Sequence, residues 1–288
     1  MAKLLFGCGY LGGRVAGLWR AAGESVYAVT RTPARAAELA AAGLQPIVAD
    51  VAGGGQFDLP ADVRTVVFAI GYDRSGGRPI REVYAGGLAR AIQRVSASVE
   101  RFLYISSTGV YGHFAGGEVD EASPCEPVRE GGRACLAAEE VLRASRLADR
   151  SIILRLAGIY GPGRIPRAAD LAAARPIDAP ASGWLNLIHV DDAARIVLLA
   201  EARAPLPSLY VVSDGQPVVR GDYYRELARL LGAPPPQFAD PAAQSPAALR
   251  AASDKRINSQ RMFAELQPAL LYPSYREGLA AIAGCQLR

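Results

Sequence analysis

The chain has 288 residues, which is enough for one large domain or two small ones with a sizeable buried core. Half of the residues are hydrophobic, 21% are charged, and the formal net charge is only +4, with the arginines scattered along the chain. This balance is ordinary for a globular protein and excludes the basic patch by which proteins bind nucleic acid.

Composition also restricts the chemistry. Lys3 and Lys255 are the only lysines, so a mechanism that needs a lysine in the middle of the chain has none. No apolar run reaches the roughly 18 residues of a membrane span, and we expect no signal peptide, because the first apolar stretch is short and broken by glycines. The four cysteines form neither a CxxC pair nor a metal-ligand spacing. We therefore expect a reduced, cytoplasmic protein with no metal site and no membrane partner.

The first half of the chain alternates short apolar runs with amphipathic segments. We expect strands near residues 3–7, 25–30, 46–50, 65–71, 101–107 and 151–158, and helices near 11–22, 33–42, 80–97 and 132–147. Continuous apolar strands that alternate with helices are typical of a parallel sheet covered on both faces. The pattern predicts an α/β protein with a doubly wound parallel sheet, the Rossmann fold.

After residue 160 the pattern weakens, and Pro, Gly and Ala become frequent. Here the sequence predicts a helix capped by Asp191 or Asp192, a strand at 208–214, a helix that Gly232 stops, and short helices at 256–267 and 274–283. We expect a Rossmann domain at 1–160, to which 187–212 returns. A smaller C-terminal substrate-binding lobe should take most of 161–288.

The segment GCGYLGG at residues 7–13 fits the pattern GxGxxG between a strand and a helix. Gly7 would permit the tight turn, Gly9 the approach of a pyrophosphate, and Gly12 close packing of helix on strand. The N–H groups at the start of the helix suit the phosphates, and we include Tyr10 and Leu11 in the predicted site. A glycine-rich turn without a ligand is the alternative.

The end of the second strand, TRTPAR at 30–35, has no acid that could hold a ribose 2′-hydroxyl. Arg31 can instead pair with a 2′-phosphate, and Thr32 can donate a hydrogen bond to it. We therefore favour NADP, with NAD as the second choice. The alternative for Arg31 is a solvated side chain at a strand end.

Two further strand ends complete the predicted cofactor site. Asp50 and its neighbour Val51 close the third strand, where Asp50 can accept a hydrogen bond from the adenine amine or simply cap a turn. Ala69 and Gly71 end the fourth strand.

These motifs resemble those of the extended short-chain dehydrogenases/reductases, in the branch of NAD-dependent epimerases and dehydratases. The resemblance covers nearly the whole chain. Two further motifs, DKRINSQRM at 254–262 and YPSYREGL at 272–279, are most similar to an atypical bacterial subgroup, the YeeZ-like proteins. The order and spacing of the main motifs carry the resemblance: GCGYLGG at 7–13, AIG at 69–71, SSTGVYG at 106–112, LRLAGIYGPG at 154–163 and NLIHVDDAA at 186–194.

The resemblance implies that the Ser107 hydroxyl contacts the substrate oxygen. The family also uses a tyrosine as acid and base, and a lysine four residues later that lowers its pKa. Counted from Pro127, the tyrosine position falls on Gly131 and the lysine position on Cys135, so this pair is missing. The glutamate that usually follows in the same helix is present as Glu139.

Three interpretations of the missing pair stay open. The acid can have moved, with Tyr111 as our first choice and His113 and Tyr160 as alternatives. The chain can instead be a non-catalytic NADP-binding sensor or regulatory protein, or Cys135 can act as a nucleophile. The resemblance implies an NAD(P)-dependent oxidoreductase or epimerase-like protein. Its substrate would be a small hydroxyl or carbonyl compound, with nucleotide sugars as candidates.

Two further residues allow two structural interpretations each. Arg155 can be buried and paired or reach the substrate pocket, and Trp184 can shape that pocket or pack in the core. His189 is expected to be structural. Family members often form homodimers through helices of the Rossmann domain, although no apolar stripe in this sequence demands it.

Overall fold

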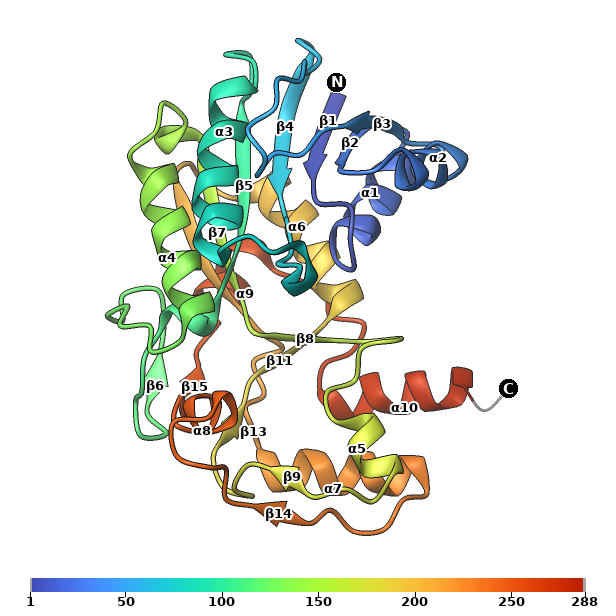
Figure 1. Ribbon diagram of the computed structural model, residues 1–288, viewed down its shortest axis with the longest axis vertical. Helices are drawn as coiled ribbons and strands as arrows, with labels where there is room; N and C mark the ends of the chain where they lie inside the picture. The colour runs from blue at the N-terminus through green and yellow to red at the C-terminus, as the bar shows by residue number, and fades with distance from the viewer. Residues whose placement is uncertain (1, 287–288) are drawn as a thin grey trace. The chain divides into compact units, whose positions relative to one another are not determined.

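The computed structural model describes residues 2–286 and divides into two compact units (Figure 1). The first unit consists of residues 1–110, 130–155 and 194–210, and the second of 111–129, 156–193 and 211–288. The sequence-based boundaries placed 111–129, 156–160, 187–193 and 211–212 with the Rossmann domain, whereas these four segments pack with the second unit.

The first unit is built on a seven-stranded sheet in the order β12-β7-β5-β4-β1-β2-β3. The pairs β1–β2, β1–β4, β2–β3 and β4–β5 are parallel. The chain reverses its direction of winding between β1 and β4, which confirms the predicted doubly wound sheet. The strands are β1 (Ala2–Phe6), β2 (Ser25–Thr30), β3 (Gln45–Val48), β4 (Val63–Phe68), β5 (Arg101–Ser107), β7 (Ser151–Leu156) and β12 (Ser208–Val212).

Alternation of side chains along the strands sends apolar residues to both faces of this sheet. Leu4 and Phe6 of β1 share one core with Leu88 of α3 (Gly87–Arg94) and Leu142 of α4 (Glu130–Arg143). Leu5 points to the opposite face, toward α1 (Gly12–Ala21). The unit also contains α2 (Pro33–Ala41), the π-helical turn η2 (Glu82–Gly86), three short 3-10 turns and, from Ala194 onward, α6 (Val190–Arg203).

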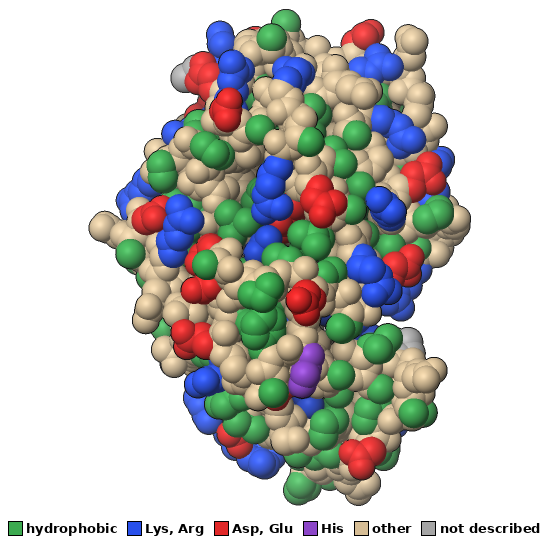
Figure 2. All heavy atoms as spheres, turned by 90° about the vertical axis from the view of Figure 1, so that its left-hand side faces the viewer, with side chains coloured by type: hydrophobic (Ala, Val, Ile, Leu, Met, Phe, Trp, Pro, Cys, Tyr) green, Lys and Arg blue, Asp and Glu red, His purple; other side chains and the backbone are tan. Residues whose placement is uncertain are grey.

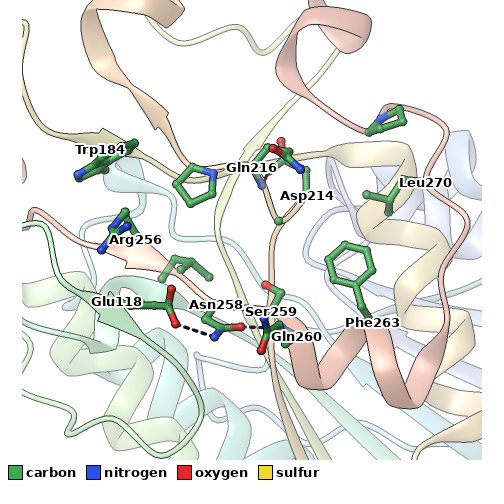
Figure 3. A pocket seen from close by; sticks show the side chains of 14 residues that line it. Glu118, Trp184, Asp214, Gln216, Arg256, Asn258, Ser259, Gln260, Phe263 and Leu270 are labelled. Atoms are coloured by element: carbon green, nitrogen blue, oxygen red, sulfur yellow. Dashed lines mark hydrogen bonds between the residues drawn. The ribbon is translucent and has the colours of Figure 1, made fainter.

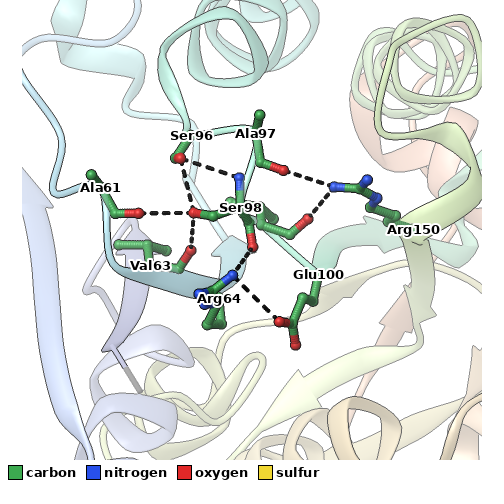
Figure 4. Close-up of polar contacts among 9 residues, drawn as sticks. Ala61, Val63, Arg64, Ser96, Ala97, Ser98, Glu100 and Arg150 are labelled. Carbon is green, nitrogen blue, oxygen red and sulfur yellow. Dashed lines mark hydrogen bonds and ion pairs between the residues drawn. The ribbon is translucent and has the colours of Figure 1, made fainter.

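Loops at the amino-terminal edge of the sheet are tied together by side chains that bond to backbone carbonyls (Figure 4). The Arg150 guanidinium donates to the carbonyl oxygens of Ala97 and Val99 at 2.9 and 2.7 Å. Ser98 Oγ donates to the carbonyl of Ala61 at 2.8 Å. These bonds join the starts of β4, β5 and β7, so this edge is structural and the opposite, carboxyl-terminal edge is left for a ligand.

The second unit combines two-stranded pairs with short helices around an aromatic core. Its pairs are β6–β15, β8–β11, β9–β14 and β10–β13, and its core includes Tyr160, Tyr223 and Tyr275. Its elements are β6 (Glu118–Val119), β8 (Gly158–Tyr160), α5 (Ala168–Ala172), β9 (Ile177–Asp178), β10 (Trp184–Leu185), β11 (Leu187–His189), β13 (Val218–Val219), α7 (Arg220–Leu231), β14 (Phe238–Ala239), α8 (Pro246–Ala251), β15 (Arg256–Ile257), α9 (Gln260–Leu266) and α10 (Tyr275–Gln286).

Two local predictions were wrong in this unit. Residues 256–257 form β15, paired with β6, and the helix begins only at Gln260. Asp191 and Asp192 lie inside the first turn of α6, and Asp192 instead accepts hydrogen bonds from the backbone N–H groups of Leu271 and Tyr272 at 2.7 and 3.0 Å. In both cases a partner distant in sequence determines the local structure.

The sequence predicted neither a membrane-spanning segment nor a basic patch. No helix within residues 2–286 combines the length and hydropathy that crossing a bilayer requires. On the face shown in Figure 2, basic and acidic side chains are interspersed, without a broad area of one sign.

Candidate functional site

The turn between β1 and α1 has the stereochemistry of a dinucleotide-binding loop. Gly7 has a φ of +93°, and a Cβ there would lie 2.6 Å from the backbone of Ala69. At Gly12 a Cβ would lie 2.2 Å from the Gly7 carbonyl oxygen. By contrast, nothing lies within 4 Å of a Cβ built on Gly9 or Gly71. Two glycines are thus needed for packing, whereas two border open space that a phosphate and ribose could fill.

The beginning of α1 is suited to bind an anion. Leu11 occupies the N-cap without a side-chain hydrogen bond, and the first turn contains no acidic residue. The Arg14 guanidinium lies over the Tyr10 ring, 4.5 Å from its centroid, and donates to the Tyr10 carbonyl. The helix dipole and the Arg14 charge therefore both favour a phosphate at this end.

At the end of β2, two arginines occupy the region expected for the adenosine ribose. Arg31 pairs with Asp73 at 2.9 Å, and both side chains are exposed. A hydrogen bond from Ser75, together with Arg31, lowers the pKa of Asp73 to about 2. Arg35 donates to the Cys8 carbonyl oxygen within the glycine-rich loop at 3.2 Å. Asp73 was not among the residues predicted from the sequence, because only the folded chain brings the loop after β4 to the end of β2.

The other predicted cofactor residues have defined local roles. Thr32 caps α2, because its Oγ1 accepts the N–H of Arg35 at 3.2 Å. Asp50 accepts the N–H of Ala52 at 3.1 Å, which is the turn cap given as its alternative, and also pairs with Arg78 at 3.1 Å. Val51 is buried. These contacts place Thr32 and Asp50 beside the site with part of their hydrogen-bonding capacity already in use.

Ser107 closes β5 at the same edge of the sheet. Its Oγ accepts the N–H of Gly109 at 3.0 Å. Gly131 lies in the first turn of α4, where a Cβ would have only the Ile80 side chain near it, at 3.8 Å. A larger side chain at Gly131 would therefore meet little crowding at its Cβ. Cys135, one turn later, is buried and shares a hydrogen bond with Tyr104 of β5.

Beneath Ser107 lies a buried ionic cluster centred on Glu139. One carboxylate oxygen accepts from Ser106 Oγ at 2.6 Å and from Arg155 Nε at 3.0 Å. The other accepts from Arg155 and from Arg143 at 2.7 and 2.8 Å. Arg155 is thus buried and paired, which is the first of the two interpretations given for it above. The cluster joins α4 to β5 and β7 next to the serine.

The three candidate replacement acids all belong to the second unit. Tyr111 is fully buried, and its hydroxyl donates to the Asp120 carbonyl at 2.6 Å. The Tyr160 hydroxyl donates to the Ser274 carbonyl at 3.3 Å, and burial, followed by the charge of Asp214, raises its pKa. His113 is exposed. Both tyrosine hydroxyls therefore serve backbone carbonyls within their own unit.

Lys255 does not occupy the family's lysine position but is buried in the second unit. Its Nζ donates to Ser253 Oγ at 2.7 Å and to the Tyr111 carbonyl at 3.4 Å. Burial, and then the charge of Arg129, lower its pKa to about 8. Lys255 thus anchors the segment that follows the Ser107 motif.

Residues of the motif YPSYREGL pack against His189 and Tyr160 within the second unit. Tyr272 stacks on His189 with a centroid distance of 3.9 Å, and His189 meets the edge of Tyr160 at 5.2 Å. A Cβ on Gly278 would lie 2.1 Å from the Tyr160 hydroxyl. The prediction of a structural His189 agrees with this packing.

The glycine loop, the open surface beside it and the cationic end of β2 define a nucleotide-binding protein with a Rossmann fold. A family model described as the NAD dependent epimerase/dehydratase family matches residues 4–212. The chain belongs to this family and is therefore an NAD-dependent oxidoreductase or epimerase. Within residues 2–286, no group of three or more His, Cys, Asp or Glu side chains is placed to hold a metal ion.

Individual relatives agree with this assignment. Protein YeeZ of Escherichia coli K12 is 30% identical over 225 residues, which is 77% of each chain. A conserved protein of unknown function from Silicibacter pomeroyi is 30% identical, with a TM-score of 0.81 over 99% of this chain and 98% of that one. MoeE5, solved with UDP-glucose and NAD, is 22% identical with a TM-score of 0.78 over 100% and 99%, which shows a shared fold.

Proposed function

We propose that the chain catalyses NADP-dependent oxidation, reduction or epimerisation of a small hydroxyl or carbonyl compound, with a nucleotide sugar as the favoured substrate. The observation that carries this proposal is the open surface at Gly9 and Gly71 beside the end of β2, which has Arg31 and no acid of its own; the Asp73 that pairs with Arg31 comes from the loop after β4. The UDP-glucose bound to MoeE5 supports the choice of a nucleotide sugar. A nicotinamide nucleotide in this site would supply or accept the hydride.

Ser107 is the residue that we assign to the substrate oxygen. Its Oγ already accepts a hydrogen bond from the Gly109 N–H, which leaves the hydroxyl proton for an oxygen of the substrate. Tyr111 fits proton transfer poorly, because its buried hydroxyl is held by the Asp120 carbonyl. The proposal therefore assigns substrate positioning to Ser107 and leaves proton exchange to a group of the substrate or to water.

A non-catalytic NADP-binding protein is the second candidate. It is favoured by Gly131 and Cys135, which stand where the family has its proton-transferring pair, and by the hydrogen bond between Cys135 and Tyr104. A sensor of this kind would bind NADPH with an unchanged affinity in every Ser107 variant and would turn over no substrate.

We expect Arg31→Ala to weaken NADPH binding by about 10- to 100-fold, because a hydrogen bond to a charged group contributes about 1.5–3 kcal/mol. NADH binding should change by less than about threefold, because NADH has no 2′-phosphate. Fluorescence titration of both nucleotides measures this difference. Arg20→Ala is the control, since Arg20 lies at the other end of α1. Equal losses for NADPH and NADH would contradict the NADP assignment.

We expect Ser107→Ala to lower turnover of a carbonyl substrate by about 100- to 1,000-fold, the loss typical when one hydrogen-bond donor to a reacting oxygen is removed. NADPH affinity should stay the same. The measurement is NADPH oxidation over a panel of nucleotide sugars and simple carbonyl compounds. Ser98→Ala, at the opposite edge of the sheet, is the control. Turnover that survives Ser107→Ala would remove this residue from the mechanism, and NADPH binding without any turnover would favour the sensor.

A further inference from the structure

The second unit contains a pocket of about 640 Å³, a volume within the range of about 300–1,000 Å³ that small-molecule sites usually have (Figure 3). All of its lining residues belong to the second unit, and none belongs to the glycine loop or to the strand ends of the cofactor site. We call it the C-terminal pocket. Its residues come from four separate parts of the chain, near positions 118, 184, 214–217 and 256–273.

One wall of the C-terminal pocket is a fixed aromatic surface. The Trp184 backbone N–H donates to Asp254 at 2.7 Å, and the Arg256 guanidinium lies 5.6 Å from the centroid of the Trp184 ring. Arg256 is itself held by a hydrogen bond to the Gly116 carbonyl at 3.0 Å. Phe263 lines the pocket from α9. A half-exposed tryptophan held in this way offers a rigid stacking surface at little cost in conformational entropy.

The polar lining is rich in hydrogen-bond acceptors. Asn258 donates to Glu118 at 2.7 Å and accepts the Gln260 N–H at 2.9 Å, so its amide fixes the direction of the Glu118 carboxylate (Figure 3). Asp214 is buried, and its Oδ1 accepts the Gln216 N–H at 2.9 Å. Its Oδ2 accepts no hydrogen bond from any residue that the structure describes. Glu118 thus presents an ordered carboxylate, and Asp214 adds an oxygen with unused hydrogen-bonding capacity, which favours a ligand that donates hydrogen bonds.

The motif DKRINSQRM, which the cofactor site does not use, builds much of this pocket. The Asn186 side chain donates to the Lys255 carbonyl at 2.9 Å and accepts the Ile257 N–H at 2.7 Å. Ser259 and Ser213, both buried, share a hydrogen bond of 2.8 Å. The segment is therefore held on both sides before any ligand arrives, as a preformed binding site requires.

We propose that the C-terminal pocket binds a small planar aromatic molecule that carries a cationic N–H donor group. The ring packs against Trp184, and the cationic donor group is attracted by the Glu118 carboxylate. This inference does not depend on the proposed function, because no residue of the cofactor site takes part in it.

Three probes of similar size test the charge and the hydrogen-bonding direction. Benzamidine is a cationic donor, benzamide is a neutral donor, and benzoate is an anionic acceptor. We expect benzamidine to bind with a dissociation constant on the order of 1 mM, as is typical of a fragment. Benzamide should bind at least about threefold more weakly and benzoate not measurably. Cyclohexanecarboxamidine, which has the cation but no aromatic ring, should also fail to bind.

Binding can be followed at the pocket itself. The chain has two tryptophans, so Trp19→Phe leaves Trp184 as the only one, and its fluorescence should change saturably with benzamidine. Ligand-observed NMR on the otherwise unmodified chain repeats the test without that substitution. Trp184→Ala should abolish the NMR signal, and Glu118→Gln should weaken benzamidine about three- to tenfold. Glu265→Gln, an exposed acid on the same helix as Phe263, should have no effect.

Several outcomes would overturn the proposal. These are no binding of benzamidine at 10 mM, tightest binding of benzoate, or an unchanged signal in folded Trp184→Ala. Because the probes contain no nucleotide, their binding is independent of whether NADPH binds. Failure of the pocket and failure of the proposed NADP site are therefore observed separately.

Discussion

Glu139→Ala is expected to lower the free energy of unfolding by about 3–5 kcal/mol, because it removes the carboxylate that holds a buried arginine. Glu139 is fully buried and contacts Arg155 through both of its oxygens. Ser106 and Arg143 bond to the same carboxylate, so the substitution breaks four hydrogen bonds at once. Typical domains are stable by only about 5–15 kcal/mol, so this loss is a large part of the total.

Urea unfolding followed by circular dichroism measures this effect. Glu139→Gln should lose less, because it keeps the shape and part of the hydrogen bonding. The double variant Glu139→Leu with Arg155→Met should recover most of the loss, because it removes both buried charges together. Glu140→Ala, the exposed neighbour on α4, is the control. A loss of under about 1 kcal/mol in Glu139→Ala would show that the buried pair does not stabilise the junction of α4 with β5 and β7.

Asp214→Asn is expected to stabilise the protein more at pH 8 than at pH 5, by a difference of about 2–3 kcal/mol. Burial raises the pKa of Asp214 to about 7, from the 3.8 of an exposed aspartate, and the nearby carboxylates of Asp192 and Glu277 act in the same direction. Between these two pKa values the folded state keeps a proton that the unfolded state has released. The stability that this proton contributes is present below about pH 4 and is lost as the pH rises through 7.

Asparagine keeps the acceptor for the Gln216 N–H and carries no charge at any of these pH values. The measurement is urea unfolding of both proteins at pH 5, 6.5 and 8. Asp222→Asn, which removes a half-exposed acid on α7, is the control. If the advantage of Asp214→Asn is the same at pH 5 and pH 8, Asp214 is ionised in the folded protein throughout this range.

The local pattern of apolar residues and glycines was sufficient to predict much of the fold. The apolar runs at 25–30 and 101–107 coincide with β2 and β5, and Gly232 ends α7 with a φ of +62°. The backbone conformation of a glycine-rich turn likewise depends on only a few adjacent residues. This is why GCGYLGG located the turn before α1 correctly. Where a strand depends on a distant partner, as β15 depends on β6, the helical period of 256–267 misled the prediction.

The sequence by itself determined the doubly wound sheet and the glycine loop, because each follows from residue identity and short-range spacing. Only the tertiary structure decided which charges meet. It pairs Arg31 with Asp73 and Arg155 with Glu139, and it brings Glu118, Trp184 and Asp214 around one pocket. The paired residues lie 16 and 42 positions apart in the sequence. Their pairing depends on how the chain packs in three dimensions, and the local periodicity of the sequence does not predict which distant residues meet.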